Sequence, residues 1–581
     1  MTTKRARTRV LCLDSALVVF LLVAFWSTST TNSSTLFYIA FTVTSLAIGF
    51  SVSRRFSSRE VIFILLIAAL VLRSIVPLSK PASIVDNFPD AYRVRRIVLG
   101  LIGDGVLHAN AVGADFFTNY PGVSLLLASL QMVSGIDLSA LLKYLPILLV
   151  LPVFGAVPVC VRAIGIRNRR SELTATAIVV LIPFLMEGTS HTSPHSFGTI
   201  LLILGLAFFL DSAVGRKRRS AVCFVLVALS LVIYHVTSSL FLLAIASLFS
   251  LALAISQLGR RSQIRLGSSL ILFILVAFLA WHAYVYSSSV PELFRSIVNV
   301  LSYDIRLSTA SALPKGIKPP WMVMIEYCAF GSFGAAVLVS LFTKMNGQSL
   351  LPKLLTLVGI FLSSAFLGLW VLGGQSGTDL IPRSFLIVMI TAAPLVGAKL
   401  GRNMNGLSKT FSQYLPHSQW GNYAAGAMIT LLVLNSVYYS FPIYYYDSSV
   451  PLQTEDTRHN LENWQSLGSF VSLDMVPNQT VWSPRLGRGL VCEYSGVFRH
   501  CSEFVSQTEN RVVMEASLFP YLPRIIRDEY VMISRSMLVA PDIPGYSPDI
   551  ETPSRISTRV YDNGEIVLLI AFAPDTLVPY P

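Results

Sequence analysis

Long apolar runs separated by short polar segments dominate the chain from residue 10 to residue 443. The runs are about 16 to 26 residues long, roughly the length that a helix needs to cross a hydrocarbon core of about 30 Å. A helix satisfies its backbone hydrogen bonds internally, so it can cross lipid. We therefore predict a polytopic α-helical membrane protein with about 13 transmembrane helices. The predicted spans are residues 10–27, 35–53, 60–77, 138–163, 172–187, 194–211, 219–234, 236–256, 266–287, 321–343, 352–374, 381–400 and 423–443.

The composition agrees with a membrane protein and excludes an ordinary soluble one. Of the 581 residues, 53% are hydrophobic and 13% are charged, whereas a soluble domain carries about 25% charged residues. The mean hydropathy is +0.64. Because further apolar runs follow the first one closely, we interpret the first run as a span and not as a removed signal peptide.

The positive charge orients the chain. A net charge of +13 is also found in proteins that bind nucleic acid, but here the basic residues gather between alternate spans, and we predict no nucleic-acid partner. This distribution follows the positive-inside rule and places the N-terminus in the cytoplasm. The predicted inner ends carry little besides lysine and arginine. The basic segments are "MTTKRARTR", "SRRFSSRE", "RAIGIRNRR", "GRKRRS", "GRRSQIR" and "KLGRNMNGLSK".

The composition changes after the last span, and this change divides the chain. Residues 1–443 form the predicted transmembrane domain, whose first outside loop is 78–137. Residues 444–581 form a predicted small extracytoplasmic α/β domain, since an odd number of spans leaves the C-terminus outside. The segments "TVWSPRLGRGLVCEYSGVFRHC" and "STRVYDNGEIVLLIAFA" are typical of short strands, and "DNG" predicts a hairpin turn.

Cysteine usage supports an outside location for this tail. Cys492 and Cys501 are the only cysteines in the tail, and their spacing suits a disulfide across a hairpin, which is expected outside the cytoplasm. The alternative is a metal site with the nearby Glu493 and His500, but the spacing matches no standard zinc pattern. We expect no cofactor and no resident metal, although a divalent ion stays open as an alternative.

Ionisable residues gather near the predicted outer ends of the spans. Such residues at membrane depth are costly and are functional candidates. Each also has a structural explanation, such as helix capping, lipid headgroup contact or an interfacial hydrogen bond. The gathering is therefore more informative than any single member. The candidates are Asp86, Asp90 and Arg93 in the first loop, His191 and His195 in "MEGTSHTSPHSFG", His235 in "IYHVTSS", and Asp379 and Arg383 in "GGQSGTDLIPRSF".

The first outside loop has its own order of elements. The segment "DNFPDAYRVRRIVLGLI" predicts an amphipathic helix that starts near Pro89, with Asp86 or Asn87 as its cap. The turn "NYPG" follows, and then a short apolar helix over 123–133. That helix is too short to span a bilayer, so we expect it to lie in the interface or to dip into the outer leaflet.

Four short motifs in this layout resemble the GT-C superfamily of membrane glycosyltransferases, in particular archaeal and bacterial protein-mannosyltransferase-like members. They are "VDNFPD", "NYPG", "SPHSFG" and "YHVTSS". The chain departs from the pattern in one place, because Asp90 stands where many relatives have the histidine of Asp-x-x-x-His. It also lacks the "WWDYG" motif of oligosaccharyltransferases and a tight outside Asp-x-Asp motif, which disfavours transfer of a whole glycan to asparagine.

The resemblance implies an inverting enzyme that takes a sugar from a polyprenyl- or dolichyl-phosphate donor at the outer face. Asp90 or Asp86 would act as general base toward the acceptor hydroxyl. Arg383, with Arg93 as a second candidate, would bind the donor phosphate, which suits the guanidinium fork. The histidines and Asp379 would complete the substrate pocket. The acceptor would be a glycan, a lipid or a protein, and membrane lipids would surround the chain.

Three other functions stay open at this point. A transporter or flippase of a lipid-linked or anionic solute would show repeats and broken helices, and uptake into liposomes would reveal it. An O-antigen polymerase or ligase-like enzyme would depend on Arg306 and Arg383 more than on the aspartates. The third is a non-catalytic scaffold. Loss of sugar transfer in aspartate variants would distinguish the glycosyltransferase from all three.

Overall fold

The protein is described by a computed structural model. It describes residues 35–53, 58–79, 89–105, 120–182, 192–215, 217–256, 261–285, 320–343, 350–373, 380–401 and 420–440, four strands between 481 and 571, and a few isolated residues. Helices fill nearly all of this part up to residue 440, and five of them are long and apolar enough to cross a membrane. The chain is therefore a multi-pass membrane protein.

The helices follow the apolar runs closely. Most of the predicted spans after the first have a helix at nearly the same bounds. The first span lies mostly outside the described residues, so the count of about 13 spans stays a prediction. The helices are α2 (Thr35–Ser53), α3 (Ser58–Ser79), α4 (Pro89–Asp104), α6 (Gly122–Ser134), α7 (Leu138–Leu148), α8 (Leu151–Ala163), α9 (Arg169–Val180), α11 (Pro194–Ala213), α12 (Arg218–Tyr234), α13 (Val236–Ile255), α14 (Arg261–Tyr284), α16 (Pro320–Phe342), α17 (Leu351–Gly373), α18 (Leu380–Gly401) and α20 (Trp420–Ser440).

Small residues allow several of these helices to cross at close range. On α18, a Cβ added to Gly397 would lie 2.8 Å from the backbone nitrogen of Ala175 and from the carbonyl oxygen of Ser171 on α9. On α20, Thr430 donates to the carbonyl of Gly426 at 2.9 Å and approaches that of Ser45 on α2 at 3.4 Å. Close backbone approach through small residues is how helices associate in lipid.

Two predicted spans differ from the observed helices: one contains a turn, although its 26 residues still form one candidate span, and the other is shorter than predicted. A turn at Leu149–Val150 separates α7 from α8 within the predicted span 138–163. The predicted span 172–187 is wrong at its outer end, since α9 stops at Val180. Its 12 residues reach only about 18 Å. Pro183 follows in the sequence, and proline cannot supply the amide that a continued helix needs.

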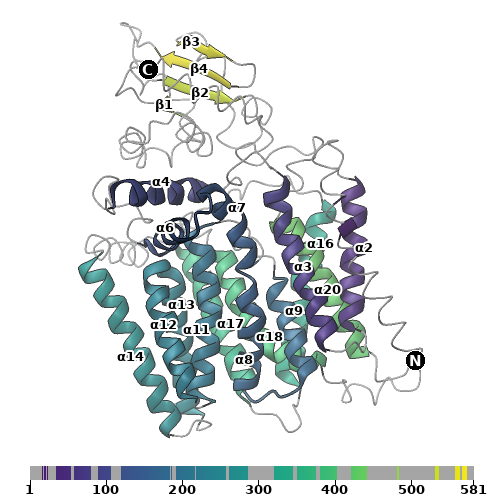
Figure 1. The fold of residues 1–581 in the computed structure, drawn as a ribbon. Helices are drawn as coiled ribbons and strands as arrows, with labels where there is room; N and C mark the ends of the chain where they lie inside the picture. Colours follow the sequence, from purple (N-terminus) through teal and green to yellow (C-terminus); the bar gives the residue numbers. More distant parts are fainter. Residues whose placement is uncertain are drawn as a thin grey trace, which may run out of the picture.

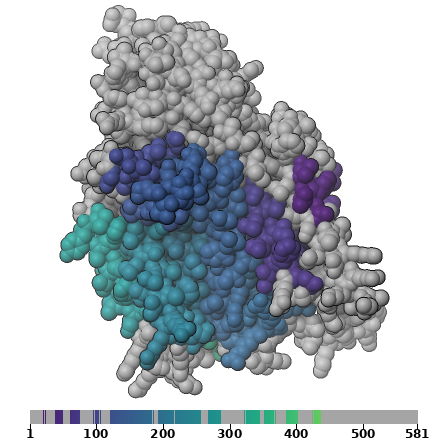
Figure 2. Space-filling model, in the orientation of Figure 1, coloured from purple at the N-terminus to yellow at the C-terminus, as the bar shows by residue number. Residues whose placement is uncertain are grey.

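The predicted helices of the first outside loop are confirmed, and they form a platform at one end of the bundle. Helix α4 begins at Pro89 as expected, and α6 lies beside it across the ends of the upright helices (Figure 1). Their surfaces lie directly against the bundle, without a visible gap (Figure 2). Apolar packing holds them there. The core under the platform consists of Val94, Val98, Val123, Leu127, Ala128, Leu138, Leu141, Leu142 and Phe197.

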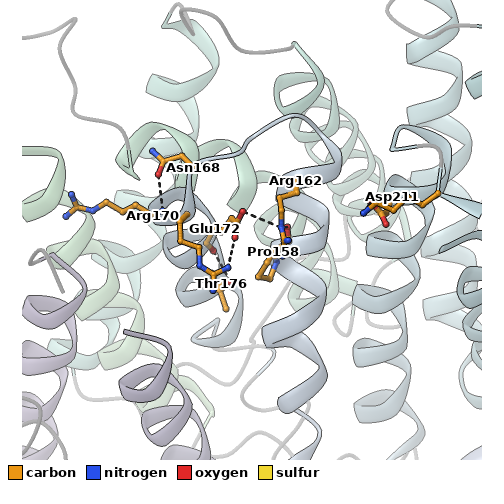
Figure 3. A network of polar contacts seen from close by, with 9 residues as sticks. Pro158, Arg162, Asn168, Arg170, Glu172, Thr176 and Asp211 are labelled. Atoms are coloured by element: carbon orange, nitrogen blue, oxygen red, sulfur yellow. Dashed lines mark hydrogen bonds and ion pairs between the residues drawn. The ribbon is translucent and has the colours of Figure 1, made fainter. Parts of the chain in front are cut away.

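The opposite end of the bundle corrects one expectation. We expected little besides lysine and arginine there, but buried acids accompany the bases. The carboxylate of Glu172 lies 2.8 Å from Arg169 and 3.4 Å from Arg162 (Figure 3). That of Asp211 lies 3.0 Å from the ammonium of Lys217. The basic partner of each acid offsets the cost of burying its charge.

The tail contains a four-stranded sheet. Its strands are β1 (Val481–Trp482), β2 (Tyr530–Ser534), β3 (Ser557–Asp562) and β4 (Ile566–Ala571), in the order β1-β2-β4-β3. β3 and β4 pair antiparallel around the "DNG" turn, as predicted. The described elements of the tail are strands alone, so its mixed α/β character stays a prediction, and Cys492 and Cys501 lie outside the described residues.

Candidate functional site

The predicted catalytic aspartates are described only in part. Asp90 and Arg93 lie in the first turns of α4, and Arg383 lies in the first turn of α18. For these three residues the structure describes the helical backbone and not the side chain. Asp86, His191 and Asp379 lie outside the described residues, so their roles stay predictions. The two remaining candidates, His195 and His235, are described completely.

His195 and His235 meet at the platform end of the bundle, although they come from different helices. His195 is the second residue of α11, and His235 separates α12 from α13. Their ring centroids are 5.3 Å apart, with an angle of 61° between the ring planes. His235 is buried and His195 is partly buried. Of the predicted site residues, these two are the pair that the structure brings together.

His235 also caps α13. Its Nδ1 accepts a hydrogen bond from the backbone N–H of Ser238 at 3.2 Å, and the Ser238 hydroxyl lies 2.8 Å from the same nitrogen. Because the backbone amide can only donate, Nδ1 is an acceptor, and the proton of the neutral ring is on Nε2. The cap therefore fixes both the orientation and the tautomer of the ring.

The "SPHS" motif explains why α11 starts where it does. Ser193 is the N-cap, and its hydroxyl accepts from the backbone N–H of Ser196 at 3.1 Å. Pro194 follows at the first helical position, where its missing N–H costs nothing. One residue earlier, the hydroxyl of Thr192 donates to the carbonyl of Leu142 on α7 at 2.8 Å. The start of α11, and His195 with it, is therefore tied to α7.

Glycine creates the space for the histidine pair. On α11, a Cβ added to Gly198 would lie 2.5 Å from the Cβ of His235 and 2.9 Å from its Nδ1. Real Cβ atoms do not approach this closely, so any larger residue at position 198 has to move the His235 ring.

The "NYPG" turn joins the platform to two further aromatic residues. Tyr120 is buried, and its hydroxyl lies 3.3 Å from Nε2 of His282 near the end of α14. Gly122 begins α6, and its Cα lies so close to the ring of Tyr234 that an added Cβ would overlap it. Tyr234 directly precedes His235. The turn therefore anchors α6 on the helices that carry the histidine pair.

A carboxylate caps the start of α7. Asp137 is the N-cap of α7 and accepts from the backbone N–H groups of Ser139 at 2.8 Å and Ala140 at 3.3 Å. Hydrogen bonding from Ser139 lowers the pKa of Asp137, and the positive charge of Arg95 on α4 acts in the same direction. Arg95, which follows Arg93 by two residues, therefore acts on this carboxylate through its charge.

The sequence interpretation missed two buried cations. Arg73, fully buried on α3, donates to the carbonyl of Ala69 and to that of Val180, both at 3.2 Å, and so holds the early end of α9. Lys143 on α7 is also buried, and it directly follows Leu142, the partner of Thr192. The signal was present, because each is a lone cation inside a long apolar run, and such residues are functional candidates.

The described side chains do not form a metal site. Among the described residues, no group of three or more histidine, cysteine, aspartate or glutamate side chains comes together as metal binding would require. The arrangement offers a set of hydrogen-bonding groups, a pair of imidazoles and buried cations at the platform end of the bundle. Such a set suits a substrate with hydroxyl groups and an anionic group.

Comparisons with known proteins gave structural matches only. No family model matches the chain, and no curated protein does. ArnT from Cupriavidus metallidurans bound to undecaprenyl phosphate has 14% identity and a TM-score of 0.47, covering 88% of this chain and 97% of that chain. The apo state of the same protein has 14% identity and a TM-score of 0.47, covering 89% and 99%.

A third match is the Archaeoglobus fulgidus oligosaccharyltransferase tethered with an acceptor peptide, with 12% identity and a TM-score of 0.45, covering 86% of this chain and 72% of that chain. All three TM-scores are below 0.5.

Proposed function

We propose that this chain is a membrane glycosyltransferase that moves a sugar from a polyprenyl-phosphate-linked donor to an acceptor at the platform end of the bundle. One observation carries the proposal. The platform of α4 and α6, on which Asp90 lies, packs over the helix ends that bear the His195–His235 pair. A carboxylate at the interface and a polar cluster beneath it are the parts that transfer from a lipid-linked donor needs.

The general base would come from the start of α4. A carboxylate can take the proton of an attacking hydroxyl when it lies within hydrogen-bond reach. Position 90 precedes Val94 by one helical turn, and Val94 is buried against the bundle. Helical periodicity thus places position 90 near the side of α4 that faces the bundle. Asp86 stays the alternative base. A single attack of this kind inverts the anomeric centre.

The donor phosphate would be held by cations near the same end. α18 runs antiparallel to α9, because Gly397 near its end packs against Ser171 and Ala175 near the start of α9. The first turn of α18, which contains Arg383, therefore lies at the platform end of the bundle. The N-terminus of a helix favours anions, and a guanidinium binds two phosphate oxygens. Arg93 and the buried Lys143 are further candidates.

The histidine pair would contact the sugar. Because Nδ1 accepts from Ser238, the proton of the neutral His235 ring is at Nε2. A neutral imidazole in this state donates a hydrogen bond to a hydroxyl or to a phosphate oxygen without adding a buried charge. Because Gly198 has no Cβ, the His235 ring can keep the position from which it would make that contact.

The test is sugar transfer by the purified full-length chain from polyprenyl-phosphate sugars, with Asp90→Asn, Asp86→Asn and the double variant. We expect the variant of the true base to lose about 100-fold or more in rate, in line with the typical contribution of a general base. Asp137→Asn is the matched control, since asparagine also caps helices well. Wild-type rates in both single variants and in the double variant would reject the carboxylate base.

A second candidate function, transport of an anionic solute, is favoured by one observation. α9 ends within the bundle at Val180, and its last carbonyl is bound by the buried Arg73. Helices that break at membrane depth are common at transporter binding sites. Uptake of a radiolabelled sugar phosphate into liposomes that contain the protein, without sugar transfer, would support this function over the first.

A further inference from the structure

A second charged cluster lies at the end of the bundle opposite the platform. Glu172, in the first turn of α9, has a side chain only 5% exposed. Its Oε2 lies 2.8 Å from Nη1 of Arg169, and its Oε1 lies 3.4 Å from Nε of Arg162 at the end of α8. Figure 3 shows the carboxylate directed from α9 toward Arg162. One buried acid thus holds two arginines from neighbouring helices.

The two arginines are held and yet stay accessible. The side chains of Arg162 and Arg169 are 55% and 49% exposed. Arg162 uses Nε for Glu172 and for the carbonyl of Pro158 at 3.2 Å. A guanidinium has five N–H donors, so the described contacts leave most of its donors for a further ligand. Because Glu172 pairs with both arginines at once, the two guanidinium groups are oriented in the absence of a ligand.

The exposure pattern of α12 indicates headgroup depth for this end of the bundle. Arg218 and Arg219 are exposed at its start, and Val222 and Leu226, within the next two turns, are 62% and 60% exposed. A change from exposed basic to exposed apolar side chains marks the boundary between the lipid headgroups and the acyl chains. α8 packs against α9 and α11, and α11 against α12, so Arg162 lies at the same end.

The charge of the cluster selects an anionic partner. Arg162, Arg167, Arg169 and Arg170 surround this junction, and Glu172 is the acid that the structure places among them. A basic pocket between helices at the membrane surface suits anionic headgroups, and paired guanidinium groups suit the oxygens of a phosphate.

We propose that Arg162 and Arg169 form a binding site for the phosphate of an anionic phospholipid, with Glu172 as the residue that positions both guanidinium groups. The site lies at the end of the bundle away from the proposed reaction and does not depend on it. Its role is to fix the junction between α8 and α9 in the membrane surface, where α9 enters the centre of the bundle.

The experiment measures lipid retention by native mass spectrometry on the purified full-length chain, with added phosphatidylglycerol or phosphatidylcholine. In the double variant Arg162→Lys with Arg169→Lys, both side chains keep a positive charge that can pair with Glu172. They lose the planar guanidinium group that binds two phosphate oxygens. We expect about tenfold weaker retention of phosphatidylglycerol, because lysine does not replace arginine at a bidentate phosphate site. The matched control, Arg218→Lys with Arg219→Lys, keeps wild-type retention.

Three results would overturn the proposal. They are equal loss in the test and control variants, no loss in either, and equal retention of phosphatidylcholine and phosphatidylglycerol by the wild type. Displacement of the lipid by inorganic phosphate alone would identify a free anion as the occupant and would also overturn it. If the double variant is not recovered as a folded protein, Arg162→Lys and Arg169→Lys alone give the same comparison.

Discussion

The imidazole rings of His195 and His235 lie with their centroids 5.3 Å apart and their planes 61° from each other, beneath the interfacial platform. Nearly all of α11 and the whole of α12 separate them in the sequence. The contact depends on two local features, the serine–proline start of α11 and the histidine cap of α13. Both features can be changed separately, which makes the role of the pair testable.

Gly198→Ala should displace His235 without removing any polar group. The added Cβ would lie 2.5 Å from the Cβ of His235, so either the ring or α11 has to shift. Overpacking of this kind costs about 1 to 3 kcal/mol. We expect a lower melting temperature and a larger loss in transfer rate than stability explains. Gly155→Ala, where no atom lies within 4 Å of the added Cβ, is the control and should leave both unchanged.

The two roles of His235 can be separated by comparing His235→Ala with His235→Asn. Alanine removes the cap on the Ser238 amide and the ring, so it should lower stability by about 1 kcal/mol and reduce transfer. Asparagine can still accept that hydrogen bond, so it should keep near wild-type stability while transfer falls. Melting temperature and transfer rate are the two measurements. Wild-type transfer in the asparagine variant would limit His235 to a capping role.

Much of the helical fold was predictable, because the length of an apolar run sets the length of a span. The bounds of α2 match the prediction, and "DNG" predicted the β3–β4 hairpin. The early end of α9 was not predictable, since it depends on a guanidinium from another helix, Arg73, that binds the Val180 carbonyl. The turn between α7 and α8 follows from Pro146 and Pro152, which each remove a helical amide donor.

The candidate site was predictable only as a set of residue types. "SPHSFG" and "YHVTSS" identified the two histidines, but no spacing along one chain says that they touch. Lys143 and Arg73 were missed because they lie inside apolar runs that were interpreted as plain spans. Glu172 was missed at the opposite end, since its burial depends on Arg162 and Arg169 from the same junction.

Acid should weaken the cap at the start of α7. The folded-state pKa of Asp137 is lowered, first by hydrogen bonding from Ser139. A group with a lowered folded pKa stabilises the fold fully above its ordinary value of about 3.9 and loses that contribution as the pH falls through the folded value. The wild type should therefore lose melting temperature below pH of about 4 more steeply than Asp137→Asn, whose amide does not titrate. Parallel curves for the two proteins would contradict this role.

Gly122→Ala should loosen the platform from the bundle. The added Cβ would overlap the ring of Tyr234, and α6 would have to move away from α12. We expect faster proteolysis of the chain between α4 and α6 and a cost of about 1 to 3 kcal/mol. The control is Gly103→Ala on α4, which meets no atom within 4 Å. Because the clash is with one ring, adding Tyr234→Leu should restore protease resistance in part. Resistance equal to wild type in Gly122→Ala alone would show that α6 is held by its apolar face and not by the fit of the "NYPG" turn on Tyr234.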